Sequence, residues 1–423
     1  MVETLLWSYI FICATLILFN VGFMLAMAVR AYVQRRRVKR MRKRIIHQMI
    51  RIFRGQEVEG EYLTFLSVAL MLPNVLADYD KALEEIRSEI ENGEFYLVDF
   101  DERTRVWIHL HDTVEKPGKR EEADSKVRMV LRPKRSVMKP VEKGIAWSCF
   151  ERHIEYTANV ITSLTNAYRK KDEILQTYYA AFLHKYGYMQ YSKPTTLIAN
   201  LKDLLEDGGV FASENALQAV YTAKDENLVL DMLRILDKKE EFVHPKIISD
   251  GLLAFRGDAH ALQRLLLQHR KDFSVKMQVN ILTYLRFVSG AYCEEVFEIL
   301  SSETEHDEVR FSCMRYFGKY RYDKAFRLLA DFAKNEKGER IEYSIVALMT
   351  LRNYPSKKTM EILHSKLNSP YWFVRYNAAE SLEVLGARYE ELVDVFDGDD
   401  RFAREMLQYQ FDQRYAENKE RGL

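Results

Sequence analysis

The clearest hint of chemistry in the chain is the run "WIHLHD". His109 and His111 are two residues apart, so in a strand both side chains point to the same face, and Asp112 follows directly. Imidazole and carboxylate groups at this spacing could bind a metal ion. The sequence offers no second ligand cluster, and its other histidines do not recur at a fixed spacing. We therefore expect surface histidines on a strand and no bound metal.

Two further fragments look like parts of known sites but are incomplete. "FYLVDFDERT" resembles the nucleophile strand of haloacid-dehalogenase-type phosphatases through Asp99 and Asp101, but Thr104 is one position late and the glycine is missing. "RPKRS" (132–136) resembles the arginine motif of cyclic-dinucleotide-binding barrels, whose second motif is absent. GxxxxGK[ST], GxGxxG and GxSxG are also absent. We expect no catalytic residue and no cofactor.

The four cysteines give no sign of a metal or disulfide framework. None of them forms a CxxC pair: Cys13, Cys149, Cys293 and Cys313. Only 8 Pro and 17 Gly occur among 423 residues, and 48% of the residues are hydrophobic. This composition predicts a mostly α-helical chain.

The N-terminus carries an uncharged segment of 25 residues, Leu5 to Val29. As a helix it would reach roughly 37 Å, enough to cross the ~30 Å hydrocarbon core of a bilayer. Trp7 and Tyr9 stand where aromatic side chains anchor at the interface. "AMA" (26–28) looks like a signal-peptidase site, but the apolar run is too long and no basic segment precedes it. We predict an uncleaved transmembrane anchor over residues 1–30.

A basic segment follows directly. Residues 29–55 hold eleven Lys or Arg and no acidic residue. Such charges favour a cytoplasmic position and attract anionic lipid, so we expect the N-terminus outside and the rest of the chain in the cytosol. The residues expected at the membrane interface are Arg30, Arg35, Arg36, Arg37, Lys39, Arg40, Arg42, Lys43 and Arg44.

The same segment is amphipathic. Val38, Met41, Ile45, Met49 and then Ile52 with Phe53 recur at spacings of three and four. This pattern predicts a juxtamembrane helix over residues 31–55 that lies on the leaflet.

Charge distribution argues against nucleic acid as the partner of the basic segment. Residues 56–423 contain 52 Lys and Arg against 61 Asp and Glu, a net charge of about −9. An acidic body is a poor binder of phosphate backbones. We expect a membrane partner and no nucleic acid.

Residues 56–149 differ from the rest. Residues 61–93 read as a helical hairpin that turns near Pro73 and Asn74, which could be a divergent first repeat. "GEFYLVDF" and "RVWIHLH" flank a polar turn and predict a β-hairpin, to which "SKVRMVLRP" could add a third strand. We expect a small β-containing insert within a mostly α-helical protein.

The C-terminal part repeats. Segments such as "HDEVRFSCMRYFGKY" and "SPYWFVRYNAAESLEVLG" share an apolar stripe at helical spacing, and each is followed by a second amphipathic segment. Aligning Ile247, Met277, Val309, Ile341 and Val374 gives steps of 30, 32, 32 and 33 residues. A period near 30 with two helices per unit predicts an α-solenoid over residues 150–423. Gly386 is placed to end its helix.

The chain here resembles the HEAT-repeat family, particularly its short bacterial type. The motif D-x-x-V-R-x-x-A-A-x-x-L is closely matched by "SPYWFVRYNAAESLEVLG", except that Ser369 or Asn368 stands where Asp is common. The resemblance is clearest over residues 210–395. It implies that Arg310 and Arg375 are structural and pair with an acidic group of the same or a neighbouring repeat. It indicates an architecture and says little of activity.

The last repeats are rich in aromatic residues, which often anchor interfaces. We expect many of them to pack between repeats and propose an exposed docking patch of Tyr320, Tyr322, Tyr371 and Trp372.

The resulting hypothesis is a non-enzymatic scaffold on the bacterial cytoplasmic membrane. By analogy with membrane-tethered HEAT proteins, the expected protein partner is a membrane glycosyltransferase that makes surface polysaccharide. Two alternatives remain: a lyase-type HEAT enzyme or enzyme subunit that acts on a tethered cofactor, and a sensor whose span pairs with a receptor through Gly22 and Ala26.

Overall fold

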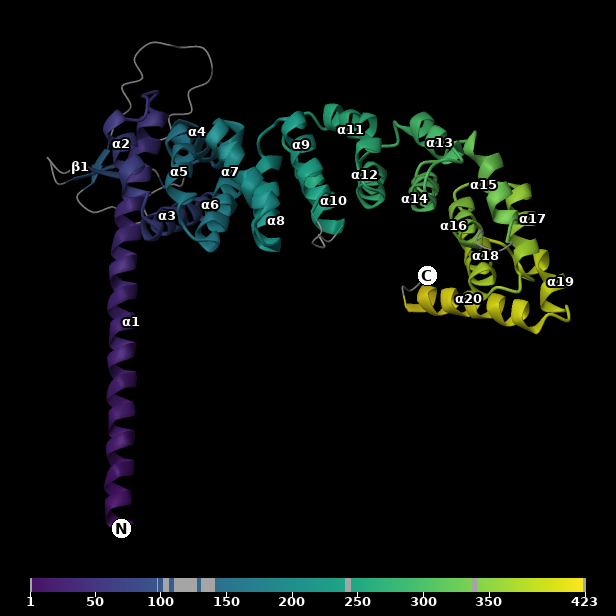
Figure 1. Ribbon diagram of the computed structural model, residues 1–423, viewed down its shortest axis with the longest axis horizontal. Helices are drawn as coiled ribbons and strands as arrows, with labels where there is room; N and C mark the ends of the chain where they lie inside the picture. Colours follow the sequence, from purple (N-terminus) through teal and green to yellow (C-terminus); the bar gives the residue numbers. More distant parts are fainter. Residues whose placement is uncertain are drawn as a thin grey trace. The chain divides into compact units, whose positions relative to one another are not determined.

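The computed structural model is mostly α-helical (Figure 1). It describes residues 2–96, 98–101, 106–109, 128–130, 141–239, 245–336 and 341–420. The chain divides into two compact units, Met1–Lys224 and Asp225–Leu423.

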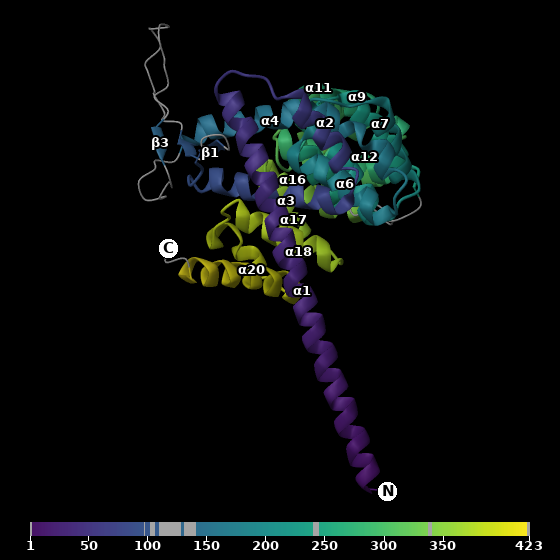
Figure 2. The ribbon, with the colours of Figure 1, turned by 90° about the vertical axis from the view of Figure 1, so that its left-hand side faces the viewer.

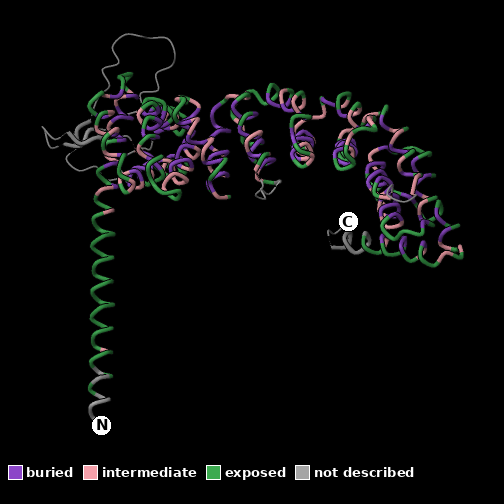
Figure 3. The backbone as a smooth tube through the Cα atoms, viewed as in Figure 1, coloured by how far each residue is buried: buried purple, intermediate pink, exposed green. Residues whose placement is uncertain are grey.

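The first helix, α1 (Val2–Phe53), is continuous and has two very different halves. Nearly all described side chains from residue 11 to residue 33 are exposed, whereas much of the stretch from Val38 to Ile52 is buried (Figure 3). The exposed half is long and apolar enough to cross a membrane. One rigid helix therefore joins a candidate membrane span to the packed core of the first unit, as Figure 2 shows.

The apolar stripe of the basic segment faces this core and not the leaflet. Val38, Ile45 and Met49 are at most 3% exposed, in the part of α1 that packs against α3 (Pro73–Glu91) and α4 (Lys143–Ser163). The prediction of a separate helix 31–55 lying on the membrane surface is therefore wrong. An amphipathic stripe can be buried by lipid or by protein, and here helices bury it.

The predicted helical hairpin of residues 61–93 is present as α2 (Gly60–Ala69) and α3, with the turn at residues 70–72. Three short strands follow: β1 (Val98–Asp101), β2 (Val106–His109) and β3 (Arg128–Val130). They pair antiparallel in the order β1-β2-β3, with Val98 opposite His109 and Trp107 opposite Val130. His111, Asp112 and most of this segment lie outside the described residues, so the β-containing insert as a unit stays a prediction.

The rest of the first unit is a stack of helices. Its elements are α4, α5 (Thr165–Tyr168), α6 (Glu173–Tyr186), the 3-10 turn η2 (Tyr188–Gln190), α7 (Thr195–Glu206) and α8 (Val210–Tyr221). Helices α6 and α8 run side by side in the same direction, because Glu173 and His184 of α6 bond to Gly209 and Gln218 respectively.

Aromatic side chains fill the core of this unit. Tyr168 and Tyr179 stack at 4.6 Å between ring centroids. His153 is fully buried on α4, its ring 5.9 Å from that of Tyr62. Its Nε2 shares a 3.2 Å hydrogen bond with Tyr79 Oη.

The second unit is a row of helix pairs. Its helices are α9 (Glu226–Asp237), α10 (Pro245–Leu253), α11 (Ala259–Gln268), α12 (Val275–Val288), α13 (Cys293–Ser301), α14 (Asp307–Phe317), α15 (Ala325–Lys334), α16 (Ile341–Leu351), α17 (Lys357–Lys366), α18 (Trp372–Val384), α19 (Val393–Phe396) and α20 (Arg401–Glu420). The 3-10 turns η3 (Arg270–Asp272) and η5 (Tyr389–Glu391) join neighbouring helices.

The residues aligned from the sequence occupy equivalent places in this row. Four of them, Ile247, Met277, Val309 and Val374, are the third residues of α10, α12, α14 and α18. The two-helix period is therefore confirmed for this unit. Gly386, at φ +78°, ends α18 in the left-handed conformation as expected, and the Ala387 N–H donates to Leu382 O (3.0 Å).

The first helices of successive pairs are parallel. Thr350 Oγ1 donates to Met314 O (3.1 Å), which joins the ends of α16 and α14, and Ser381 Oγ donates to Leu348 O (3.0 Å) between α18 and α16. At the other end, Tyr343 Oη donates to Asp307 Oδ1 (2.5 Å).

Carboxylates link one helix pair to the next. The Asp258 N–H donates to Glu226 Oε1 (3.0 Å), and the Ser274 N–H donates to Asp237 Oδ2 (2.6 Å). Asp258 and Ser274 are the N-cap residues of α11 and α12. Negative charge near a helix N-terminus is stabilising, so these bonds fix the spacing of successive pairs.

The buried His153 makes the first unit acid-sensitive. Burial lowers the pKa of His153 to about 3, whereas an unfolded histidine titrates near 6.5. Below pH ~6.5 the unfolded chain binds a proton that the folded unit does not, so stability falls as the pH falls, by about 2 kcal/mol at pH 5. Urea unfolding of the wild type and His153→Gln at pH 7.5 and 5 checks this. The variant is expected to lose that part of the pH dependence, and an equal pH dependence in both proteins contradicts it.

Candidate functional site

One face of α1 beyond the span is cationic. Arg35, Arg36, Lys39 and Arg40 are exposed. At roughly 100° per residue, Arg36 and Arg40 lie opposite the stripe that begins at Val38, and Arg35 and Lys39 lie on its flank. Arg30 is exposed at the end of the apolar segment. These five of the nine charges predicted for the membrane interface are therefore exposed beside the apolar segment.

Other basic residues of the segment bind the protein itself. Arg37 Nε lies 2.9 Å from the buried Asp78 Oδ2, and Arg42 Nη2 lies 2.6 Å from Glu89 Oε2. The Arg44 guanidinium lies 3.9 Å from the centre of the Phe65 ring. These contacts hold α2 and α3 on α1. Lys43 is half-buried.

The predicted anchoring aromatics lie at the start of α1. Trp7 and Tyr9 are each 67% exposed. Both are therefore open to the surroundings of the candidate span.

The four aromatic residues predicted to dock a partner do not form one patch. Tyr320 and Tyr322 follow α14 and are half-buried in the helix stack. The Tyr320 ring packs on that of Tyr316, with 5.0 Å between the centroids, and the Tyr322 ring stacks on that of Phe317, with 5.9 Å between the centroids. The Tyr322 hydroxyl also donates to the Glu294 carboxylate. These contacts make both residues part of the packing between repeats.

Tyr371 and Trp372 are exposed, at the start of α18. Because α14 and α18 are parallel, the C-terminal end of α14 and the N-terminal end of α18 are opposite ends of the helix layer. The Trp372 ring contacts residues of its own helix: its centroid lies 5.0 Å from that of Phe373 and 5.1 Å from that of Tyr376. The contiguous docking patch was therefore predicted wrongly, since the sequence does not show which end of a helix each residue occupies.

Arg310 and Arg375 make contacts within the repeats. Arg310 Nε donates to Leu300 O (3.1 Å) and its Nη1 to Tyr343 Oη (3.1 Å). Arg375 Nη1 donates to Ser369 O (2.6 Å). The expected pairing with a carboxylate is replaced by bonds to carbonyl and hydroxyl oxygens, although Arg310 reaches Asp307 through Tyr343.

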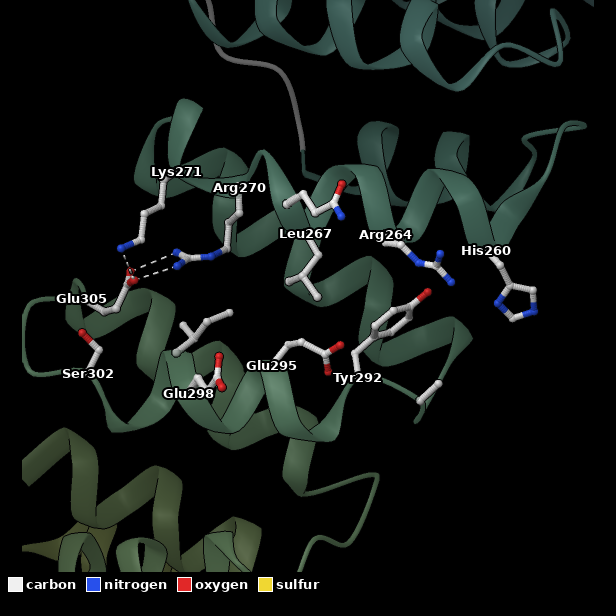
Figure 4. A pocket seen from close by; sticks show the side chains of 13 residues that line it. His260, Arg264, Leu267, Arg270, Lys271, Tyr292, Glu295, Glu298, Ser302 and Glu305 are labelled. Carbon is white, nitrogen blue, oxygen red and sulfur yellow. Dashed lines mark hydrogen bonds and ion pairs between the residues drawn. The ribbon is translucent and has the colours of Figure 1, made fainter.

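The second unit contains a groove of about 740 Å³ between α11 and α13 (Figure 4). The wall from α11 and η3 is basic, with His260, Arg264, Arg270 and Lys271. The wall from α13 and the loop after it is acidic, with Glu295, Glu298 and Glu305. Apolar side chains between them include Leu267, Ile299 and Tyr292.

An ion pair closes one end of this groove. Arg270 is 4% exposed, and its Nη1 and Nη2 donate to the two carboxylate oxygens of Glu305 at 2.9 and 2.6 Å. These bonds lower the pKa of Glu305 below its usual range. Within the described chain Arg264 forms no ion pair with Glu295 or Glu298, and all three side chains are exposed, so the charges at the middle of the groove are open to a partner.

Sequence reasoning missed this groove. A signal was present, because His260, Arg264, Gln268 and Lys271 recur every three or four residues on one helix face. Polar residues at that spacing usually indicate a solvated face, and the facing acidic wall becomes apparent only from the packing of the helices.

The described residues contain no arrangement typical of catalysis. No group of three His, Cys, Asp or Glu side chains able to hold a metal was found among them. Burial raises the pKa of the Cys149 thiol to about 11 and that of Cys313 still further, so neither is an activated nucleophile.

No family model matches the chain, and no curated protein matches it. The fold and surface must therefore carry the functional argument.

The Arg270–Glu305 pair is expected to stabilise the packing of η3 against the loop between α13 and α14 at one end of the groove. Glu305→Ala leaves a buried guanidinium without its carboxylate and should destabilise this part of the unit by about 3–5 kcal/mol. Lys271→Ala is the control, because Lys271 also approaches Glu305 (3.5 Å) but is 75% exposed and should cost less than about 1 kcal/mol. Hydrogen exchange of α12 and α14 measures both changes. Similar protection in the two variants contradicts a structural role for the pair.

Proposed function

We propose that this protein is a membrane-anchored helical scaffold that docks a protein partner at the membrane surface. The observation that carries the proposal is the continuity of α1, whose exposed apolar half is joined without a break to a half buried in the first unit. A flexible tether would leave the helical units free to tumble. A buried helix instead fixes the first unit at a set height above the bilayer.

The cationic face of α1 supports a cytoplasmic position for the helical units. Arg35, Arg36, Lys39 and Arg40 make a compact positive surface about one to three helical turns beyond the apolar segment. Positive charges next to a span are retained on the cytoplasmic side and attract anionic lipid. The N-terminus then faces outward.

The groove between α11 and α13 is the proposed docking surface. Its basic and acidic walls fit a peptide segment that carries acidic residues on one side and basic residues on the other. Anchoring raises the local concentration of the scaffold near membrane proteins, so a modest contact suffices. On the resemblance to membrane-tethered HEAT proteins, the proposed partner is a membrane glycosyltransferase.

The orientation of α1 depends on its exposed cations. Replacing Arg35, Arg36, Lys39 and Arg40 by Gln should leave the fold intact, because these side chains are exposed. It should lower the fraction of chains with the N-terminus outside. Protease protection of an N-terminal epitope in intact cells measures that fraction. The matched control replaces Lys238, Lys239, Lys357 and Lys358, and an equal effect in both proteins argues against this role.

The docking surface can be tested by photocrosslinking in the native membrane. A photoreactive residue at Arg264 or Glu298 should give one crosslinked integral membrane protein, whereas the same residue at the exposed Asp323 should not. With the photoreactive residue at Glu298, the double charge reversal Arg264→Glu and Glu295→Lys should reduce the yield at least about tenfold, since it exchanges the signs of the two walls.

Mass spectrometry of the adduct then tests the partner. A polytopic glycosyltransferase supports the proposal. If the adduct contains another membrane protein, the scaffold role stands and the glycosyltransferase is rejected as the partner. Equal crosslink yields at Glu298 and Asp323 reject the groove as the docking surface.

A further inference from the structure

Six apolar side chains are exposed at one end of the first unit, outside the candidate span. Ile174 is 81% exposed and Phe211 is 77% exposed, which is unusual for large apolar residues of a packed unit. We call the set the apolar edge: Val68, Met71, Leu72, Ile174, Val210 and Phe211. Single exposed apolar residues need no explanation, but a cluster indicates an interaction surface.

Hydrogen bonds bring the three parts of the apolar edge together. Tyr168, just before α6, donates through its hydroxyl to Leu70 O (2.9 Å) in the α2–α3 turn. Glu173, the first residue of α6, accepts from the N–H of Gly209, the N-cap of α8 (2.7 Å). The α2–α3 turn and the starts of α6 and α8 therefore lie next to one another.

The apolar edge lies at the end of the unit from which the exposed half of α1 leaves. Glu59 pairs with Arg51, and Phe65 lies against Arg44, so α2 runs antiparallel to α1 and descends toward the span. Figure 1 shows the lower ends of α6 and α8 level with the point where α1 leaves the packed part of the unit.

The height of this end fits the headgroup layer of a bilayer. The exposed apolar surface of α1 continues past Arg30 to Tyr32 and Val33. Side chains of α1 first reach α3 at Gln34 and Arg37, which both interact with the Asp78 carboxylate, one to four residues or roughly 2–6 Å further along the helix. The polar layer on each side of a bilayer is also about 5–8 Å thick, and Arg30 can extend its guanidinium from the span into that layer.

The carboxylates nearest the edge are partly engaged. Asp172 accepts from the Leu175 N–H (2.9 Å), and Glu173 binds Gly209. Lys170 and Lys171 are exposed beside Ile174, whereas Glu206 and Asp207 are exposed before α8. The edge is therefore mixed in charge, and its common property is the exposed apolar surface.

We propose that the apolar edge inserts into the headgroup layer of the leaflet from which α1 emerges, as a second membrane contact of the first unit. The inference rests on the proposed function, since it requires α1 to span the membrane. A span alone lets the unit rotate and tilt about α1. An apolar contact beside the span fixes which side of the unit faces the bilayer.

The test uses the full chain in lipid nanodiscs, with a diazirine-bearing residue placed at Leu72, Ile174 or Phe211. Leu25, in the apolar segment, is the positive control. Gln56 is the matched negative control, because it is exposed on the same unit but follows the far end of α1. Lipid adducts at the three edge positions should exceed those at Gln56 at least about tenfold.

The controls separate this inference from the proposed function. Lipid adducts at Leu25 with none at the edge overturn the inference and leave the anchor intact. No adduct at Leu25 overturns the anchor itself and the inference with it.

Two further arms test the kind of contact. If the contact is apolar insertion, adding anionic phosphatidylglycerol to a phosphatidylcholine disc should change the lipid-adduct yields at the edge less than about twofold. A change in these yields above about fivefold overturns apolar insertion in favour of electrostatic attraction. In native membranes, protein adducts in place of lipid adducts at the edge overturn it in favour of a protein contact.

Discussion

The structure depends on one helix that meets two environments. Helix α1 is exposed and apolar through its first half and is packed against α3 and α4 through its second half. The exposed apolar surface of the first half is long enough for a bilayer to cover it, and the stripe from Val38 to Ile52 is covered by protein. The salt bridge from Arg37 to the buried Asp78 stands close to the boundary between the two. In the proposed membrane-anchored arrangement, this boundary sets the position of the first unit relative to the bilayer.

The helix pairs of the second unit are held by contacts between neighbours. A helix pair of a solenoid cannot bury its apolar face alone, so its stability depends on the next pair. Here the neighbours are also joined by polar links, such as the Asp237 carboxylate on the start of α12 and the Arg270–Glu305 pair. Helix α20 packs on α18 with Ala403, Leu407 and Gln410 buried.

The surface features proposed to act lie where packing is incomplete. The groove lies between the described residues of α11 and α13, and its two walls carry opposite charges. The apolar edge exists because three helix ends meet there and no other described element of the first unit covers them. Both are proposed as binding surfaces, and burial keeps the thiols of Cys149 and Cys313 protonated and inactive.

Local pattern was enough to predict the long apolar helix, the two-helix period and the end of α18 at Gly386. These features are set by helix periodicity, chain length and the conformational freedom of one glycine, all of which are local. The same pattern could not say what covers the stripe around Ile45, because lipid and protein present equally apolar surfaces to it. Nor could it separate Tyr322, which packs between repeats, from Trp372, which is exposed. Exposure is decided by which helices become neighbours, so the groove and the apolar edge belong to the tertiary structure.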